Sequence, residues 1–489
     1  MQTPYPPVFI RPVNTTAHRH DAIVVGSGPN GLSAAITLAR EGRRVLVIEA
    51  AATVGGGARS AEVTLPGFVH DLCSTVHPMG VGSPFLRTLP LEKHGVRWIQ
   101  PPAPAAHPMD DGSAAVLERS VAATAATLGA DGPAYSRMME PLLGTWELLA
   151  DEILAPLHFP SHPWILARFG VKAIRSGRGL AESLFRDPAA RALFAGMAGH
   201  SILPLESPAS AAFGIVLGLF GHAVGWPVVA GGSQRLSDAL AAHLRSLGGE
   251  IQTGTRVSSL SELPPARAVL LDVTPRQFNA IASGGRNPRR RRMENFRYGP
   301  GVFKVDWALG GPIPWTAPDC ARAGTVHVGG TLDEIAASEA AMARGEISDR
   351  PFVLLTQPSL FDRSRAPAGK EVAWAYCHVP NGCDRDRLSA IESQVERFAP
   401  GFRDRILARH TTTPAQLEAY NANCVGGDVS GGANDIAQLF TRPLVQADPY
   451  ATGIPGVYLC SASTPPGGGV HGMCGHNAAL AVLRRELRD

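Results

Sequence analysis

The sequence lacks the cysteine patterns of a disulfide framework, a zinc site or a dithiol redox centre. Its seven cysteines are odd in number and scattered from Cys73 to Cys474, and no C-x-x-C spacing occurs. Disulfide scaffolds carry an even, dense set of cysteines, and zinc sites need closely spaced ligands. We therefore expect no bound metal.

Charge and leader signals are also sparse. Charged residues make up 18% of the 489 residues, and the net charge of +3 is too small to indicate nucleic-acid binding. Residues 1–20 are polar and proline-rich, without a charged-then-apolar leader or a twin arginine, and we expect them to form a loose N-terminal arm. The chain is therefore expected to be cytoplasmic.

What the sequence does contain begins with a short unit at residues 21–60. The apolar runs 22–25 and 45–48 are typical of buried strands, and Glu49 follows the second run. Between them lie Gly26-Ser27-Gly28-Pro29-Asn30-Gly31, the pattern G-x-G-x-x-G, and a helical composition over 32–40. A strand, glycine turn, helix, strand and acid within about 30 residues predict a dinucleotide-binding βαβ unit.

The residues of the glycine turn have separate expected roles. Gly26 permits the tight turn, Gly28 lets the backbone approach a diphosphate, and Gly31 lets the helix pack close to the strand. The free N–H groups where the helix begins, around Pro29 and Asn30, then face the phosphates.

A second glycine cluster, Gly55-Gly56-Gly57-Ala58-Arg59, follows the βαβ unit. The strand, the G-x-G-x-x-G, the acid and this Gly-Gly-x-x-Arg together resemble the FAD-binding start of the amine oxidase and phytoene desaturase group of flavoproteins. The resemblance implies that Gly56, Gly57, Ala58 and Arg59 contact FAD, with Arg59 supplying positive charge near the phosphates.

The ribose and adenine side of the cofactor has its own candidates. Glu49, with Ala50 beside it, can accept hydrogen bonds from ribose hydroxyls, and an acid here disfavours the 2′-phosphate of NADP. The resemblance implies that residues 255–257 form a strand whose backbone at Val257 pairs with the adenine edge.

The C-terminal segment extends the resemblance over nearly the whole chain. Residues 456–460 read as a strand, 465–472 as a glycine-rich loop and 477–485 as a helix. In the family this segment adjoins the flavin, and the helix dipole stabilises the negative charge of the reduced ring. The FAD contacts implied here are Ser461, Gly468, Gly469, Val470 and Met473.

The predicted fold is a discontinuous α/β FAD-binding Rossmann-like domain with an α+β substrate domain built on an antiparallel sheet and a helical insertion. The expected FAD-binding domain comprises residues 21–112, 225–290 and 425–489. The expected substrate-binding domain comprises 113–224 and 291–424. Within it we predict helices over 120–128, 133–153 and 183–197, and strands over 296–309, 325–328, 352–356 and 371–378.

The most apolar segment, 209–223, is shorter than the ~20 residues that a membrane span needs. We expect a buried helix that lines a substrate cavity, with a membrane-touching surface as the alternative. A basic cluster, Arg286 and 289–292, is expected to be a solvated face; attraction to anionic lipid or to a phosphorylated substrate is its alternative. Peripheral membrane contact is therefore left open.

Catalytic residues are harder to assign than cofactor contacts. His77, Asp428 and His471 lie in polar loops expected near the flavin and are the candidate acids or bases; for His77, loop packing is the alternative. The amine oxidase branch commonly has a lysine that positions a water near flavin N5, and Lys304 is the only candidate for it.

The resemblance implies an FAD-dependent dehydrogenase, desaturase or double-bond isomerase. Its substrate would be a hydrophobic small molecule, such as a polyene or polyketide-like compound, that transfers a hydride to flavin N5. Because only one G-x-G-x-x-G of the sequence, at residues 26–31, lies in a strand–turn–helix–strand unit, we expect oxygen or a quinone as the electron acceptor rather than a nicotinamide partner. A flavin amine oxidase and a non-catalytic FAD-bearing interaction protein are the alternatives.

Overall fold

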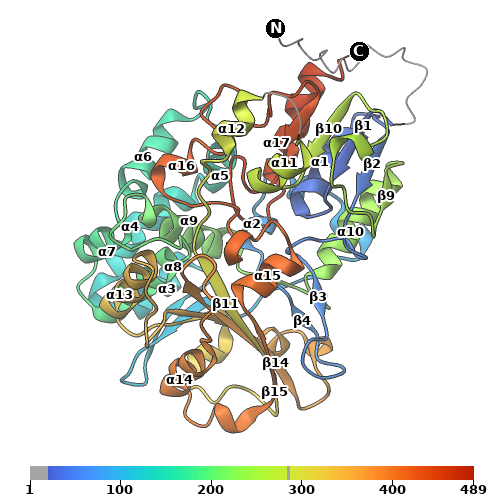
Figure 1. Cartoon of the computed structure of the whole chain (residues 1–489). Coiled ribbons are helices and arrows are strands. Elements are labelled where there is room, and N and C mark those ends of the chain that lie inside the picture. The colour runs from blue at the N-terminus through green and yellow to red at the C-terminus, as the bar shows by residue number, and fades with distance from the viewer. Residues whose placement is uncertain (1–19, 284–286, 489) are drawn as a thin grey trace.

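The computed structural model describes residues 20–283 and 287–488, which form two β-sheets flanked by a layer of helices (Figure 1). The predicted arm lies outside the described residues except for His20, and Arg286 of the basic cluster also lies outside them.

The first sheet is parallel throughout, with the strand order β16-β10-β1-β2-β9. Its strands are β1 (Ala22–Val25), β2 (Val45–Ile48), β9 (Glu250–Gln252), β10 (Ala268–Leu271) and β16 (Val457–Leu459). They come from the beginning, the middle and the end of the chain, so the predicted discontinuous Rossmann-like sheet is confirmed. β1 and β2 are buried along their whole length, which explains their unbroken apolar sequence.

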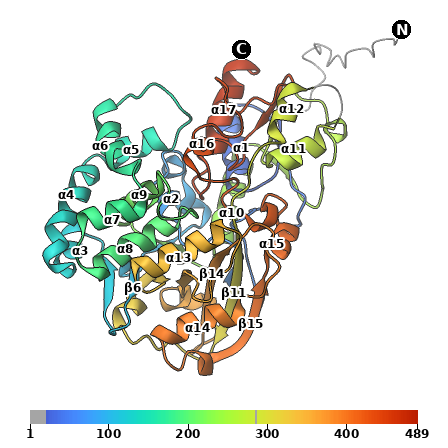
Figure 2. The same ribbon diagram turned by 60° about the vertical axis from the view of Figure 1, so that its left-hand side comes forward.

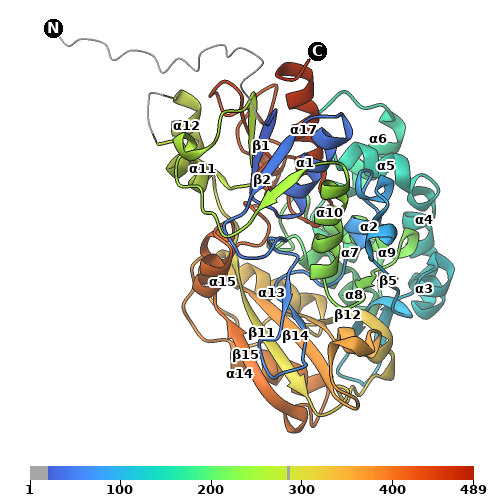
Figure 3. The same cartoon turned by 90° about the vertical axis from the view of Figure 1, so that its right-hand side faces the viewer.

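Helices cover both faces of this sheet (Figure 3). On one face lie α1 (Pro29–Arg40), α10 (Gln234–Ser246) and α17 (Met473–Arg485). On the other face lie α11 (Pro275–Ile281) and α12 (Pro288–Met293). α1 begins three residues before the expected position 32, because proline is well suited to the first position of a helix. α17 begins four residues before the expected position 477.

The second sheet has seven strands in the order β15-β11-β14-β13-β12-β6-β7. Its strands are β6 (Ala103–Pro108), β7 (Ala114–Leu117), β11 (Gly301–Leu309), β12 (Ala323–Val328), β13 (Val353–Thr356), β14 (Glu371–Val379) and β15 (Ile406–Thr412). β6 and β12 are parallel and the other neighbours are antiparallel, so the expected antiparallel sheet is mixed. β6 lies in segment 21–112, which was expected to belong to the FAD-binding domain, but it forms a strand of this second sheet.

Two short strand pairs complete the sheets. They are β3 (Ser60–Ala61) with β4 (His70–Asp71), and β5 (Trp98–Ile99) with β8 (Val228–Val229).

A helical layer covers one face of the second sheet (Figure 2). It contains α3 (Val121–Thr127), α4 (Gly132–Leu143), α5 (Trp146–Ile153), α6 (Pro163–Ala173), α7 (Gly177–Leu184), α8 (Pro188–Gly199), α9 (Ser210–Ala223) and α13 (Leu332–Ala343). α14 (Leu388–Phe398) packs on the opposite face. The remaining helices are α2 (Pro78–Val81), α15 (Pro414–Tyr420) and α16 (Ile436–Leu439).

Two of the predicted helices are each split. The single helix expected over 133–153 is wrong, because α4 ends at Leu143 and Thr145 has non-helical dihedral angles before α5. The helix expected over 183–197 covers the end of α7 and most of α8. Asp187 caps α8 and Pro188 opens it, which separates the two helices.

α9 is the buried helix predicted over 209–223. None of its side chains is exposed, so the alternative that this segment forms a membrane-touching surface is wrong. Among the described residues, no helix is both long and apolar enough to cross a bilayer.

Candidate functional site

The first glycine turn joins β1 to α1 at the carboxyl end of the parallel sheet. Gly26 has a φ of +101°, a conformation that favours glycine. A Cβ at Gly31 would lie 2.1 Å from the carbonyl oxygen of Gly26, so only glycine lets α1 approach this closely. The first turn of α1 holds no acidic residue. Its N–H groups are therefore suited to an anionic ligand.

Glu49 follows β2 and is almost fully buried. Its carboxylate accepts hydrogen bonds from the backbone N–H groups of Ser27 and Ala51, both at 2.8 Å, and from the Ser27 hydroxyl at 2.6 Å. The Nη2 atom of Arg59 lies 3.3 Å from Glu49 Oε1. Two residues predicted to contact FAD from different loops thus form one buried ion pair, while Ala50 beside them is exposed.

The second glycine cluster packs directly on the first. A Cβ at Gly56 would lie 2.9 Å from the Cα of Gly28, closer than real Cβ contacts come. Tyr420, the last residue of α15, donates its hydroxyl to the carbonyl oxygen of Gly56 at 2.9 Å. A Cβ at Gly57 would contact Cys73 at 3.8 Å. The cluster therefore connects the glycine turn with residues of the second domain.

Residues 255–257 do not form the expected strand. β9 ends at Gln252, and Gly254 adopts a φ of +70°, which breaks the extended backbone. The chain still runs beside the expected ribose site, because Thr255 donates its N–H to the carbonyl oxygen of Glu49 at 2.8 Å. The contact of Val257 with adenine stays a prediction.

The C-terminal loop meets the first helix. A Cβ at Gly472 would lie 2.1 Å from Ser33 Oγ of α1, and Met473 is the first residue of α17. Gly469 has a φ of +128°, and a Cβ there would lie 3.2 Å from the sulfur of Met79. A Cβ at Gly468 would lie 2.9 Å from the carbonyl oxygen of Ser430.

The other two C-terminal residues predicted to contact FAD flank this loop. Ser461 donates its hydroxyl to the carbonyl oxygen of Val273, and the Val470 carbonyl lies against Gly80.

Each of the three catalytic candidates has a different hydrogen-bond partner, and His471 belongs to the C-terminal loop itself. His77 Nε2 lies 2.9 Å from Ser233 Oγ, and burial lowers the pKa of His77 to about 4. His471 Nδ1 accepts a hydrogen bond from the N–H of Met473 at 3.0 Å, and burial lowers the pKa of His471 to about 4 as well. Both imidazoles are therefore neutral at pH 7.

Asp428 is bound by backbone groups on both of its oxygens. Gly299 donates its N–H to Oδ2 at 2.8 Å, and Ser430 donates its N–H to Oδ1 at 2.7 Å. Burial raises the pKa of this carboxyl. The arrangement fixes the loop that touches Gly468, and a catalytic role for Asp428 stays a prediction.

Lys304 belongs to a buried polar cluster on β11 that sequence reasoning did not recognise. Its Nζ lies 2.5 Å from Asp306 Oδ1 and 5.1 Å from the ring centroid of Trp374. His70 Nδ1 is 3.5 Å from the same Asp306 oxygen. Although burial opposes ionisation, the Lys304 ammonium holds the pKa of Asp306 below its usual range. The lysine-x-aspartate spacing on a strand was the available signal.

This cluster lies next to the second glycine loop. Burial raises the pKa of the Cys73 thiol, while the nearby Lys304 ammonium acts in the opposite direction. Trp374 and Tyr376 of β14 stack with ring centroids 5.6 Å apart and an interplanar angle of 17°. Cys73, which lies against Gly57, is therefore also near the buried Lys304 ammonium and the stacked pair of Trp374 and Tyr376.

Asp272 is another residue near the glycine turn that was not predicted from the sequence as part of the site. It follows β10 and its carboxylate reaches into the first glycine turn. Its position directly after a buried strand was the signal that could have identified it.

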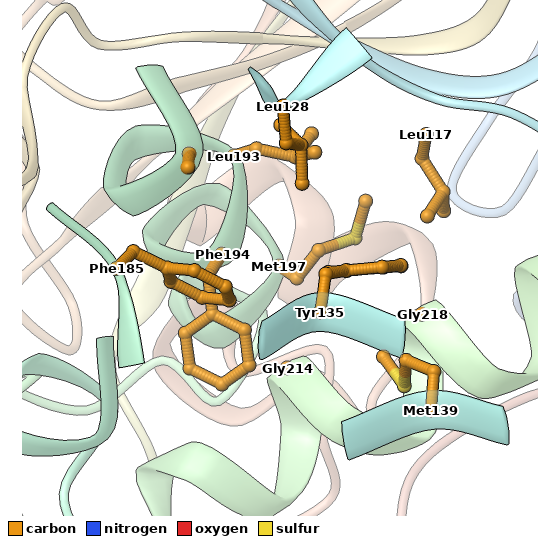
Figure 4. A pocket seen from close by; sticks show the side chains of 11 residues that line it. Leu117, Leu128, Tyr135, Met139, Phe185, Leu193, Phe194, Met197, Gly214 and Gly218 are labelled. Carbon is orange, nitrogen blue, oxygen red and sulfur yellow. The ribbon is translucent and has the colours of Figure 1, made fainter. Parts of the chain in front are cut away.

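An apolar cavity lies inside the helical layer (Figure 4). Its volume is about 10 Å³, which is room for about one water molecule. α9 contributes Gly214 and Gly218 to its lining, but a cavity of this size holds no substrate, and the prediction that α9 lines a substrate cavity stays a prediction. The hydroxyl of Tyr135, which also lines it, lies 2.7 Å from His222 Nε2.

The residues around the glycine loops fit FAD. Side chains larger than hydrogen are excluded where Gly28 meets Gly56, which lets a ligand approach the backbone at the start of α1, although the Gly31 N–H is already bound by the Asp272 carboxylate. Glu49 lies where an acceptor for the ribose is expected and its ribose contact stays a prediction, and the start of α17 is held against α1 at the other end of the site.

Comparison with known proteins supports this assignment. Residues 24–89 match the family model for an NAD(P)-binding Rossmann-like domain. The mouse (Mus musculus) pyridine nucleotide-disulfide oxidoreductase domain-containing protein 2 is 26% identical, with 95% of this chain and 93% of that protein covered. Hydroxyneurosporene desaturase of Rhodobacter capsulatus is also 26% identical, over 96% and 98% of the two chains. The structure of putrescine oxidase bound to putrescine has a TM-score of 0.59 at 18% identity and covers 95% and 99%.

The fold and the cofactor cradle define an FAD-dependent oxidoreductase. Over nearly its whole length the chain is similar to proteins of the amine oxidase and phytoene desaturase superfamily of these flavoproteins.

Proposed function

We propose that the protein is a dehydrogenase, desaturase or double-bond isomerase of a hydrophobic small molecule such as a polyene or polyketide-like compound. The observation that carries the proposal is that three buried acids on or beside the second sheet already have basic partners. Asp71 pairs with Arg365, Asp306 with Lys304 and Glu339 with His378. A cationic amine would find these carboxylates already engaged, whereas the apolar helical layer suits a hydrocarbon.

Bound FAD would supply the two-electron oxidant that takes a hydride from carbon. The residues of the chain would orient the substrate and exclude water. Trp374 and Tyr376 offer flat apolar faces, and Lys304 offers a fixed positive charge beside Cys73. The catalytic roles of His77, Asp428 and His471 stay predictions.

Oxygen or a quinone is the proposed electron acceptor, because the sequence offers one βαβ dinucleotide-binding unit, which contains the G-x-G-x-x-G of residues 26–31. A cytoplasmic location is proposed as well, and it is supported by seven cysteines that are all free.

Anaerobic reduction of the bound flavin tests the substrate class. The FAD-loaded protein is mixed without oxygen with polyenes and other apolar alkenes, and in parallel with primary amines and polyamines. Loss of the oxidised flavin band with an apolar compound, or conversion of its double bonds without net flavin reduction, supports the proposal. Bleaching by amines together with hydrogen peroxide release in air would instead establish a flavin amine oxidase.

A further inference from the structure

The α5–α6 region carries an unusual concentration of exposed apolar side chains. Nine large apolar residues are exposed among the residues that the structure describes, and six of them fall within 148–174. These six, which we call the apolar surface, are Leu148, Leu157, Phe159, Trp164, Val171 and Ile174. Phe159 is 94% exposed and Trp164 is 86% exposed, so neither contributes to the core. A concentration of this kind marks an interaction site.

The apolar surface is distinct from the side of α6 that packs inward. Phe169 and Ala173 of α6 belong to the core that includes Ile215 and Leu219 of α9. Trp164, on the other side, shares an open groove with Arg168, Val171 and Lys172, at helical spacings of four, seven and eight residues. Figure 2 shows α5 and α6 at the outer margin of the helical layer, away from both sheets.

The charge of residues 153–175 has one sign, while the exposed acids of α5, Glu147 and Asp151, pair with Arg87. Residues 153–175 contain no aspartate or glutamate, and they contain Arg168, Lys172 and Arg175. The nearest preceding acid, Glu152, is buried and bound by His158 at 2.9 Å and by His162 at 3.2 Å. The surface that α6 offers to its surroundings is therefore apolar and positive together.

We propose that the apolar surface docks on an anionic lipid bilayer. Phe159 and Trp164 would insert at the level of the head groups, where aromatic residues are favoured, and Arg168, Lys172 and Arg175 would face lipid phosphates. Charge complementarity selects lipid over a second copy of the chain, because a twofold pair would bring this basic surface against itself.

The location has a consequence for hydrophobic ligands. α6 packs on α9, and α9 lines the apolar cavity of the helical layer. Docking through α6 therefore brings the bilayer within one helix of the apolar interior. This inference goes beyond the proposed function, and vesicle binding measured without substrate can fail or succeed independently of any turnover.

Vesicle flotation of the full-length, FAD-loaded protein tests the proposal. The vesicles are phosphatidylcholine alone, or phosphatidylcholine with about a quarter phosphatidylglycerol to supply negative charge. We expect flotation with the anionic vesicles, weaker flotation with the neutral ones, and release in about 0.5 M NaCl, where charges are screened.

Two pairs of variants locate the contact. Phe159→Asp with Trp164→Asp should weaken flotation by about tenfold or more, whereas Leu407→Asp, at an exposed apolar residue on β15, should leave it unchanged. Arg168→Glu with Lys172→Glu should weaken flotation by about tenfold or more, and Arg385→Glu, at another exposed arginine, should not. All the altered side chains are exposed or lie at the groove, so folding should be retained, as thermal unfolding would check.

Three outcomes would overturn the proposal. The first is no flotation with either vesicle type. The second is flotation that the Phe159 and Trp164 substitutions leave unchanged. The third is a dimer in light scattering that these substitutions convert to a monomer without any lipid binding, which would make the apolar surface a contact between two copies of the chain.

Discussion

The carboxylate of Asp272 accepts a hydrogen bond from the backbone N–H of Gly31, with 3.0 Å between Oδ2 and the nitrogen. A Cβ at Gly28 would lie 2.7 Å from the same oxygen, so this acid sits inside the glycine turn. Burial raises the pKa of Asp272 to about 7, with the nearby Glu49 adding to the effect. The glycine turn, where a diphosphate is expected to bind, therefore already contains an acid whose pKa lies near neutral pH.

FAD affinity should fall as pH rises through 7. Below its pKa Asp272 is neutral and tolerates the diphosphate, and above it two anions share one site. Asp272→Asn should bind FAD more tightly than the parent at pH 8 and about equally at pH 5.5, as measured by titrating the apoprotein with FAD. A pH-independent affinity in the parent would contradict this account.

The same group should affect the stability of the apoprotein. The folded-state pKa of Asp272 lies above the ordinary 3.8, so the stability that the neutral acid contributes is lost as pH rises from about 4 to about 7. Asp272→Asn should therefore raise the melting temperature of the apoprotein more at pH 8 than at pH 4. An equal effect at both pH values would point to a change in packing instead.

Gly56→Ala should abolish FAD retention. Its Cβ would collide with the Cα of Gly28, and the backbone there cannot move without opening the cradle. Gly42→Ala is the matched control, since Gly42 has a φ of +72° but no neighbour within 4 Å of a new Cβ. Both variants should lose about 1 kcal/mol of stability from the left-handed backbone, and only Gly56→Ala should lose flavin. Equal flavin content in the two purified proteins would disprove the packing argument.

Lys304→Met should destabilise the protein by about 3–5 kcal/mol, because it leaves Asp306 buried without its cation. Lys304→Met combined with Asp306→Leu removes both charges and should recover most of that loss. Denaturant unfolding measures both effects. If the double variant is no more stable than the single one, the pair is not the reason that the cluster is stable.

The pH profile of substrate-dependent flavin reduction should show no histidine transition between pH 5.5 and 7.5 from His77 or His471. Burial lowers the pKa of each to about 4, so both remain neutral across this range. Rates are measured anaerobically with a saturating reducing substrate. A transition near 6.5 that disappears in His77→Gln or His471→Gln would assign that residue a proton-transfer role.

The sequence was most informative where its signals are local. The run 22–25, the glycine turn and the run 45–48 define β1, the start of α1 and β2 because burial on both faces and the turn geometry leave little choice. The strands β6 and β15 were not predicted. In β6 the apolar and polar residues alternate little, and its partner strand β12 is more than 200 residues away in sequence. Pairings at such separation depend on the whole fold rather than on local pattern.

The site was predictable in the same uneven way. Glycines indicate close backbone approaches in the sequence itself, whereas the contact of Asp272 with Gly31 and that of Arg59 with the ring of Tyr420 join segments that are more than 200 residues apart. Histidine in a loop suggested catalysis at His77 and His471, but only the folded structure shows that burial keeps both neutral.

The central claim is that the two glycine loops and the C-terminal loop bind one FAD, and the flavin content of the purified protein tests it most directly. Protein expressed with ample riboflavin should carry close to one FAD per chain, and Gly28→Trp should remove it while leaving the melting transition of the second domain in place. Colourless parent protein that takes up no added FAD, or a Gly28→Trp variant that retains the flavin, would contradict the claim.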